Sequence, residues 1–142
     1  METRQTKQVV IIRRDLKMRR GKEIAQACHA YMGVFSSHWE VKDCTDSIGA
    51  RYGLCHIQMP TLFNKAVKHW LENSFAKITV YVESEQELLD LEKQAKDAGL
   101  LHCLIQDNGK TEFHGVKTYT ALAIGLAESS DIDKITGHLK LY

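Results

Sequence analysis

The sequence predicts an α/β domain in which helices cover both faces of a mixed four-stranded sheet, giving a three-layer sandwich. Three observations predict this class. The 142 residues suit one domain over 1–142, and 44% hydrophobic with 26% charged residues is ordinary globular composition. Short β-branched runs alternate with segments of helical period. The last two runs are joined too tightly for a crossover, so we expect those strands to be antiparallel.

The N-terminal half is expected to hold one strand and two helices. Residues 7–12 (KQVVII) form a β-branched run typical of a buried strand. A basic loop over 13–20 follows, and then a helix over 21–39. Residues 41–52 are polar and contain glycine, which favours a loop. A proline in the first turn suits a helix over 60–72.

The C-terminal half is expected to complete the sheet. The run AKITVYV at 76–82 predicts a second strand, and an S-x-x-E capping box then opens a helix over 84–98 that ends at a glycine. A third strand is expected over 100–106, followed by a D-N-G turn. A fourth strand over 118–126 precedes a short helix over 129–135.

Composition argues against several classes of protein. No apolar run approaches the roughly 18 residues of a membrane helix, and the polar N-terminus lacks a secretory signal, so no membrane partner is expected. The four cysteines form no C-x-x-C pair, which favours a reduced, cytoplasmic protein. Three of them adjoin a histidine, but adjacent residues point in different directions and chelate poorly, so no metal site is expected.

Charge is unevenly distributed, although the formal net charge is only +1. Residues 1–22 hold eight Lys or Arg against two acids, whereas residues 83–97 hold six acids against two lysines. A basic cluster on a nearly neutral chain indicates an anionic partner, with nucleic acid the leading candidate. A solvated basic loop is an equal alternative on charge alone.

The helix expected over 21–39 has two distinct faces. At about 100° per residue, an apolar stripe expected to face the core consists of Ile24, Ala27, Cys28, Tyr31 and Phe35. The opposite face carries Lys22, Gln26, His29 and Gly33. A solvent-exposed polar face is the ordinary interpretation of this pattern. Its place after the first strand, near the carboxyl ends of strands where open α/β sheets bind ligands, favours a functional role instead.

Three hydroxyl or carboxyl side chains are further candidates: Asp107, Thr111 and Thr120. Asp107 lies where the third strand ends and a turn begins, although Asp before Asn-Gly is also ordinary turn chemistry. The two threonines are equally common strand residues. The sequence contains no P-loop, G-x-G-x-x-G, H-E-x-x-H or nucleophile elbow. The residues alone therefore predict a small α/β domain with a basic site and no specific reaction.

Three segments carry a resemblance to a known family. They read RRDLKMRRGKEIAQACHA at 13–30, LIQDNGKT at 104–111 and AIGLAESSDIDKITGHLKLY at 123–142. Together and in this order they resemble the archaeal and eukaryotic type of peptidyl-tRNA hydrolase. The resemblance implies hydrolysis of the ester that joins a stalled peptide to the 3′ end of tRNA, with no metal or organic cofactor. Peptidyl-tRNA is then the partner, and a homodimer is a possible assembly.

The resemblance also assigns roles to residues. The implied catalytic set is Lys17, His29, Asp107, Thr111 and Thr120. The implied tRNA-binding set is Arg13, Arg14, Arg19, Arg20, Lys22 and Gln26. We expect Asp107 to orient or deprotonate a water, and Lys17 to stabilise the oxyanion and keep Asp107 ionised. We expect the threonines to hold the water or the ester, and His29 either to transfer a proton or to place the loop.

The chain departs from the family pattern at two places that bear on function. Arg19-Arg20 stands where the family usually has Gly-Lys, and 37–75, which carries the helix expected over 60–72, is a longer connection than usual. Two alternatives stay open on the sequence: a non-catalytic tRNA- or RNA-binding module of the same fold, and a protein-interaction domain that uses 37–75. A carboxylate at Asp107 argues against the first, because phosphate binding has no use for it.

Overall fold

A four-stranded mixed sheet forms the centre of the structure. The computed structural model describes residues 5–45, 47–53, 55–59 and 64–142. The strands lie in the order β4-β1-β6-β5, with bounds β1 Thr6–Arg13, β4 Lys77–Val82, β5 His102–Asp107 and β6 Thr118–Glu128. β1 pairs parallel with β4 and antiparallel with β6, and β5 pairs antiparallel with β6. The mixed sheet and its antiparallel last pair are confirmed.

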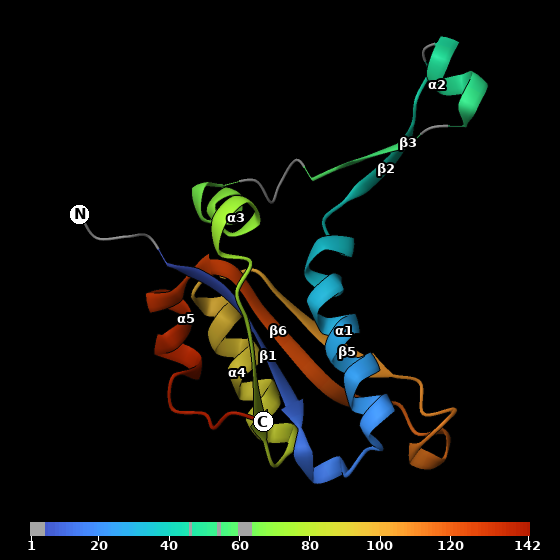
Figure 1. Cartoon of the computed structure of the whole chain (residues 1–142). Helices are drawn as coiled ribbons and strands as arrows, with labels where there is room; N and C mark the ends of the chain where they lie inside the picture. The colour runs from blue at the N-terminus through green and yellow to red at the C-terminus, as the bar shows by residue number, and fades with distance from the viewer. Residues whose placement is uncertain (1–4, 46, 54, 60–63) are drawn as a thin grey trace.

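Helices cover both faces of this sheet, as predicted (Figure 1). α1 (Arg20–Ser36) covers one face, and α4 (Glu85–Asp97) and α5 (Ser129–Thr136) cover the other. α3 (Lys65–His69), continued by a π-helical turn over Trp70–Ser74, packs against β1 and β6. No helix in the described part of the chain is long and apolar enough to cross a membrane.

The core explains why residues 9–12 of β1 are all apolar. Val9 and Ile11 pack under α4 and α5, whereas Val10 and Ile12 face α1. All four are at most 2% exposed, because successive strand residues point to opposite faces and both faces are covered. Each such side chain contributes about 1.5–3 kcal/mol on burial, so β1 is the strand on which the two hydrophobic layers depend.

Residues 40–58 form a protruding hairpin, so the prediction of a loop over 41–52 is wrong. β2 (Glu40–Asp43) pairs antiparallel with β3 (Cys55–Gln58), and α2 (Ser47–Tyr52) lies between them, standing away from the sandwich (Figure 1). Every residue of both strands is exposed, and each strand is only four residues long, so the apolar–polar alternation of Cys55–Gln58 does not correspond to a buried face.

The helix expected over 60–72 is present in part. Its predicted start at Pro60 lies outside the described residues, and the described helix begins after Asn64, whose side chain accepts hydrogen bonds from the N–H groups of Ala66 and Val67. The connection 37–75 therefore carries a hairpin as well as a helix.

The face that α1 buries overlaps the predicted apolar stripe only in part, since Ala27, Tyr31 and Phe35 pack against the core but are only partly buried. The buried residues are Gln26, Ala30, Gly33 and Val34. Ile24, from the predicted apolar stripe, is 58% exposed, and Cys28 is exposed too. The reason is a close approach between helix and sheet, since a Cβ added at Gly33 would lie 2.5 Å from Cys103 Sγ. Small side chains therefore determine which side of α1 meets the sheet. A prediction from the positions of large apolar side chains alone misplaces that side.

The C-terminal segment runs back along the free edge of β4. Tyr81 N–H donates to the carbonyl of Lys140 at 3.2 Å, and Tyr142 N–H donates to the carbonyl of Thr79 at 3.1 Å. The Tyr142 hydroxyl donates to the carboxylate of Glu23, in the first turn of α1. This segment covers an exposed strand edge and ties it to the beginning of α1.

Candidate active site

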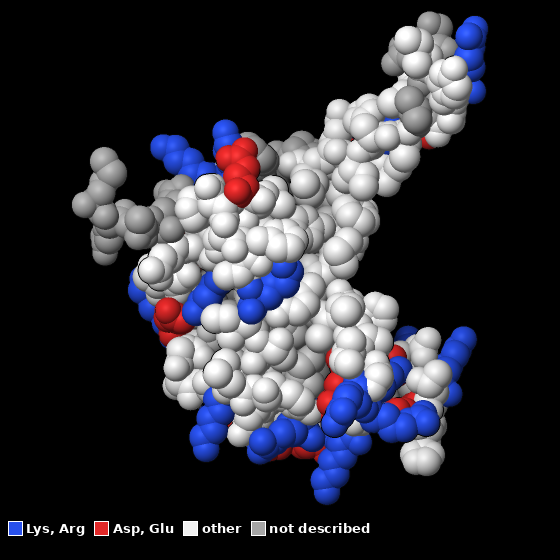
Figure 2. Space-filling model, viewed as in Figure 1, with Lys and Arg blue, Asp and Glu red and all other residues white. Residues whose placement is uncertain are grey.

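The polar candidates from both ends of the chain meet at one end of the sheet. β1, β4 and β5 point the same way, so their carboxyl ends share one edge. α1 begins at that edge after a 3₁₀ turn over Arg14–Leu16, and Asp107 is the last residue of β5. Figure 2 shows Lys and Arg side chains gathered along this lower edge of the molecule. The site therefore lies at the place where open α/β sheets bind ligands.

Asp107 is the centre of the cluster. Its Oδ1 accepts hydrogen bonds from Lys22 Nζ at 2.7 Å and from Gln26 Nε2 at 3.3 Å. Its Oδ2 accepts from the N–H of Gly109 at 2.8 Å. The side chains of Lys22 and Asp107 are only 16% and 11% exposed, so this ion pair is largely shielded from water. Lys22 and Gln26 are one helical turn apart, which brings both to the same carboxylate.

Two threonine hydroxyls extend the cluster on either side. Lys22 Nζ also donates to Thr111 Oγ1 at 2.9 Å. On the buried side, the Thr120 hydroxyl donates to Gln26 Oε1, which turns the Gln26 amide so that its nitrogen faces Asp107. Thr120 is fully buried and Gln26 is 3% exposed, whereas Thr111 is exposed. The chain Thr120–Gln26–Asp107–Lys22–Thr111 thus runs from the core to the surface.

Asp107 is held in its ionised form. Burial raises the pKa of its carboxyl, but the hydrogen bond from Lys22, the N–H of Gly109, the charge of Lys22 and the amide of Gln26 together lower that pKa below its usual value. A carboxylate with a lowered pKa is a weak base, so it suits fixing the ammonium and orienting a water. The ammonium itself is a preorganised positive charge for a developing oxyanion.

The ammonium beside Asp107 belongs to Lys22, and the predicted Lys17–Asp107 contact is a mistaken expectation. Lys17 ends the 3₁₀ turn in a left-handed conformation, with φ 49°, and its side chain is exposed. Within the described ranges the Lys17 side chain makes no hydrogen bond or ion pair, and its backbone N–H donates to the carbonyl of Arg14 at 3.1 Å. Lys22 lies inside α1 on the face turned to β5, so its stem is directed to the carboxylate. Both lysines lie in one basic segment, and the sequence does not separate them.

Two further candidates lie in places that differ from expectation. Gln26 was expected among the tRNA-binding residues, but it is buried between Asp107 and Thr120 and cannot meet a polyanion. His29 was expected in the catalytic set, but it is exposed and contacts none of the cluster. The buried stripe of α1 runs from Gln26 to Ala30, so Gln26 faces the sheet. His29 is rotated about 60° around the helix from Gln26 and therefore faces solvent.

The arginines expected on tRNA divide into two groups. Arg13 is 8% exposed and is bound by Asp15, by Glu85 and by the carbonyl of Tyr119, so it fastens the end of β1 and is not a surface cation. Arg14 is half-exposed and pairs with Glu83.

Arg19 and Arg20 are, with Arg14, the exposed members of that predicted set. The Arg19 side chain is 81% exposed and pairs with Glu112 at 2.9 Å. Arg20 is exposed at the first residue of α1. Together with exposed Lys17, these side chains leave three cations beside the Asp107 cluster that a phosphate can reach.

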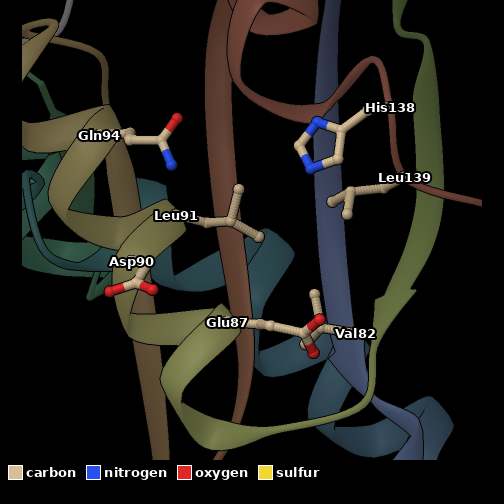
Figure 3. Close-up of a pocket in the computed structure, with 7 residues that line it drawn as sticks. All are labelled: Val82, Glu87, Asp90, Leu91, Gln94, His138 and Leu139. Atoms are coloured by element: carbon tan, nitrogen blue, oxygen red, sulfur yellow. The ribbon is translucent and has the colours of Figure 1, made fainter.

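A separate pocket of about 200 Å³ lies on the α4 face (Figure 3). It is lined by Val82, Glu87, Asp90, Leu91, Gln94, His138 and Leu139. None of the candidate residues lines it, and the imidazole of His138 faces α4 across it (Figure 3). Among the residues that the structure describes, no group of three or more His, Cys, Asp or Glu side chains is arranged to hold a metal ion.

Comparison with known proteins identifies the family. A profile described as peptidyl-tRNA hydrolase PTH2 matches residues 6–142. The chain belongs to the peptidyl-tRNA hydrolase PTH2 family. The resemblance seen in the three sequence motifs is therefore confirmed.

The PTH2 relatives come from both archaea and eukaryotes. The chain is 37% identical over 135 residues to a peptidyl-tRNA hydrolase of Methanothermobacter thermautotrophicus, covering 95% of this chain and 98% of the relative. It is 37% identical over 136 residues to a probable peptidyl-tRNA hydrolase 2 of Dictyostelium discoideum, covering 96% of this chain and 54% of the relative. For the Drosophila melanogaster relative, the chain spans 61% of the length. The chain thus matches nearly whole archaeal PTH2 proteins and just over half of the eukaryotic ones.

Sequence reasoning missed the place of two residues in this PTH2 site. Gly109 was seen only as part of a turn, yet its N–H fixes Asp107 and its φ is +80°. Gln26 was placed on the tRNA surface, yet it joins the carboxylate to the core. The available signal was the four-residue spacing of Lys22 and Gln26, followed by glycine at position 33 on the same face.

Proposed function

We propose that this chain hydrolyses the ester bond between the peptide and the tRNA in peptidyl-tRNA, which returns tRNA to translation. The observation that carries the proposal is the shielded Lys22–Asp107 pair, with Thr111 on the same ammonium, in a chain of the PTH2 family. Ester hydrolysis needs a placed water, a proton acceptor and positive charge at the carbonyl oxygen. The cluster offers a group for each need.

In the proposed reaction, water adds to the ester carbonyl carbon and the bond to the ribose oxygen breaks. Lys22 stabilises the negative charge on the carbonyl oxygen, taking the role first ascribed to Lys17. Asp107 orients the water and is the nearest acceptor for its proton, which ends on the ribose oxygen. Thr111 binds water or ester at the surface, and Thr120 acts through Gln26 as a positioning residue.

We also propose that the exposed cations beside the cluster bind tRNA phosphates. Arg19, Arg20 and Lys17 surround the start of α1 and are accessible, which supports this role. Four free cysteines and a tRNA substrate support action in the cytoplasm. Exposed apolar residues on α1, Ile24 and Met32, support a homodimer, which sedimentation at several protein concentrations tests.

The test of the function is turnover on N-acetyl-aminoacyl-tRNA, with binding of uncharged tRNA measured in parallel. We expect multiple turnovers by the wild-type chain and near-complete loss in Asp107→Asn, with tRNA bound by both. A non-catalytic RNA-binding module would bind tRNA and release no free N-acetyl amino acid. Binding without turnover by the wild-type chain would therefore contradict the proposal and favour that alternative.

A further inference from the structure

A cavity of about 620 Å³ adjoins the Asp107 cluster. It is lined by Arg19, Gly109, Lys110, Thr111, Glu112, Phe113 and His114. Gly109 and Thr111 belong to both the cavity and the cluster, since the first donates to Asp107 and the second accepts from Lys22. When the reacting bond of a substrate lies at Lys22, the chemical group next to that bond therefore lies at the entrance of this cavity.

The loop that forms the cavity is held in a strained shape. Phe113 and His114 both have positive φ, at 67° and 52°, a region that residues with a side chain rarely occupy. Gly115 N–H donates to the carbonyl of Gly109 at 3.0 Å and closes the loop. At Gly109, an added Cβ would lie 2.3 Å from the carbonyl oxygen of Val116. Such strain persists where the surrounding structure enforces it, and it concentrates at ligand sites.

The chemistry of the lining suits a flat aromatic ligand. The cavity is lined by three residues with planar side chains: Phe113, which also packs against the core beneath α1, the exposed His114, and Arg19, whose guanidinium pairs with Glu112. The Phe113 ring centroid is 6.0 Å from Lys22 Nζ, which places the ring beside the reacting end of the site. Aromatic rings and arginine planes are the surfaces on which unpaired nucleobases stack.

We propose that this cavity binds the base of the adenosine at the 3′ end of tRNA, stacked on the planar side chains of the 109–114 loop. The inference rests on the proposed function, because the scissile ester is carried by the ribose of that adenosine. The base is then one sugar away from the reacting ester, and the cavity adjoins the cluster through Gly109 and Thr111. The peptide varies between substrates and the terminal adenosine does not, so a rigid, strained pocket fits the constant group.

The experiment compares two non-hydrolysable inhibitors of peptidyl-tRNA hydrolysis. One is the N-acetyl-phenylalanyl amide of 3′-amino-3′-deoxyadenosine, and the other is the same amide on 3-amino-3-deoxyribose without a base. We expect the inhibition constant of the adenosine compound to be about tenfold lower, because stacking of one base has that order of effect. Equal inhibition constants, with hydrolysis itself intact, overturn the inference and leave the proposed function standing. Absence of hydrolysis by the wild-type chain overturns both.

Two matched variants locate the effect. His114→Gly removes the imidazole and relieves the positive φ, so the loop keeps its fold, and we expect the tenfold preference to fall at least threefold. Phe75→Gly is the control, since Phe75 is also aromatic, 60% exposed and at φ 49°, but precedes β4 at the opposite end of the sheet. An unchanged preference in His114→Gly overturns the inference. A second pair of inhibitors carries glycine in place of phenylalanine. If the effect of His114→Gly on the inhibition constant depends on this amino acid and not on the base, the cavity binds the peptide, and the inference is overturned.

Discussion

Replacing Lys22 by methionine tests which lysine supplies the ammonium of the site. The methionine keeps an unbranched stem and removes the Nζ that lies 2.7 Å from Asp107 and 2.9 Å from Thr111. Lys17→Met is the matched control, because Lys17 has the same side chain in the same basic segment but is exposed and outside the cluster.

The expected magnitude follows from the role of the charge. Loss of one preorganised group that stabilises transition-state charge lowers the turnover number by about 10²–10³, or about 2.7–4 kcal/mol of barrier. Asp107 also loses its shortest hydrogen-bond partner and the nearby positive charge, while its burial remains, so the pKa of its carboxyl rises. Lys17→Met removes a surface cation only, so we expect weaker tRNA binding and a turnover number within about threefold of wild type.

The assay is single-turnover release of N-acetyl amino acid from N-acetyl-aminoacyl-tRNA at saturating enzyme. Saturation separates the chemical step from tRNA binding. A circular dichroism spectrum and an unfolding curve for each variant confirm that the fold is kept. The reasoning is refuted if Lys17→Met loses the turnover and Lys22→Met keeps it, because the ion pair would then have no part in the reaction.

Three other predictions concern packing, pH and salt. Gly33→Ala places a Cβ 2.5 Å from Cys103 Sγ and should lower the free energy of unfolding by about 1–3 kcal/mol, whereas Gly21→Ala, with open space around it, should raise it slightly in urea titrations. The pKa of Asp107 is lower in the folded than in the unfolded protein, where it is about 3.9, so the ionised carboxylate stabilises the fold above that pH. This stabilisation is lost as the pH falls through the folded-state pKa. Unfolding curves between pH 6 and 2 should therefore show a smaller decrease in the free energy of unfolding for Asp107→Asn than for wild type. A logarithmic plot of tRNA affinity against salt should have a slope shallower by about 0.7–0.9 in Arg20→Ala, and an unchanged slope would remove that residue from the phosphate contacts.

The mixed sheet, the succession of its elements along the chain and its antiparallel last pair could be predicted because their signals are local and agree, whereas the spatial order of the strands was not predicted. The β-branched run of β1, the S-x-x-E start of α4 and the D-N-G turn after β5 each fix one element, and the short link before β6 fixes an antiparallel pair. The hairpin over 40–58 was not predicted because its two strands are short and fully exposed, and the alternation in Cys55–Gln58 is too brief to distinguish a strand from a polar loop.

The site was predictable in composition but not in arrangement. Asp107, Thr111 and Thr120 were identified from motifs, and the structure brings them together with Lys22. Lys22 meets the carboxylate because the rotation of α1 against the sheet turns it toward β5, whereas Lys17 lies in the turn before α1. That rotation is set by the close approach at Gly33, a tertiary contact with a residue 70 positions away that no local pattern contains.

The exposed hairpin divides the chain into two parts that are each chemically incomplete. The segment before α2 carries Lys22 and Gln26, and the segment after it carries Asp107, Thr111 and Thr120. Proteolytic nicking or gene splitting inside α2 would leave one fragment with the cation and the other with the anion. The two would be joined by the pairing of β1 with β4 and β6 and by the packing of α1 against β5 and β6. Neither fragment alone would contain the complete site, so hydrolysis by the mixed fragments would show that they have reassembled. The rate of hydrolysis would then measure reassembly.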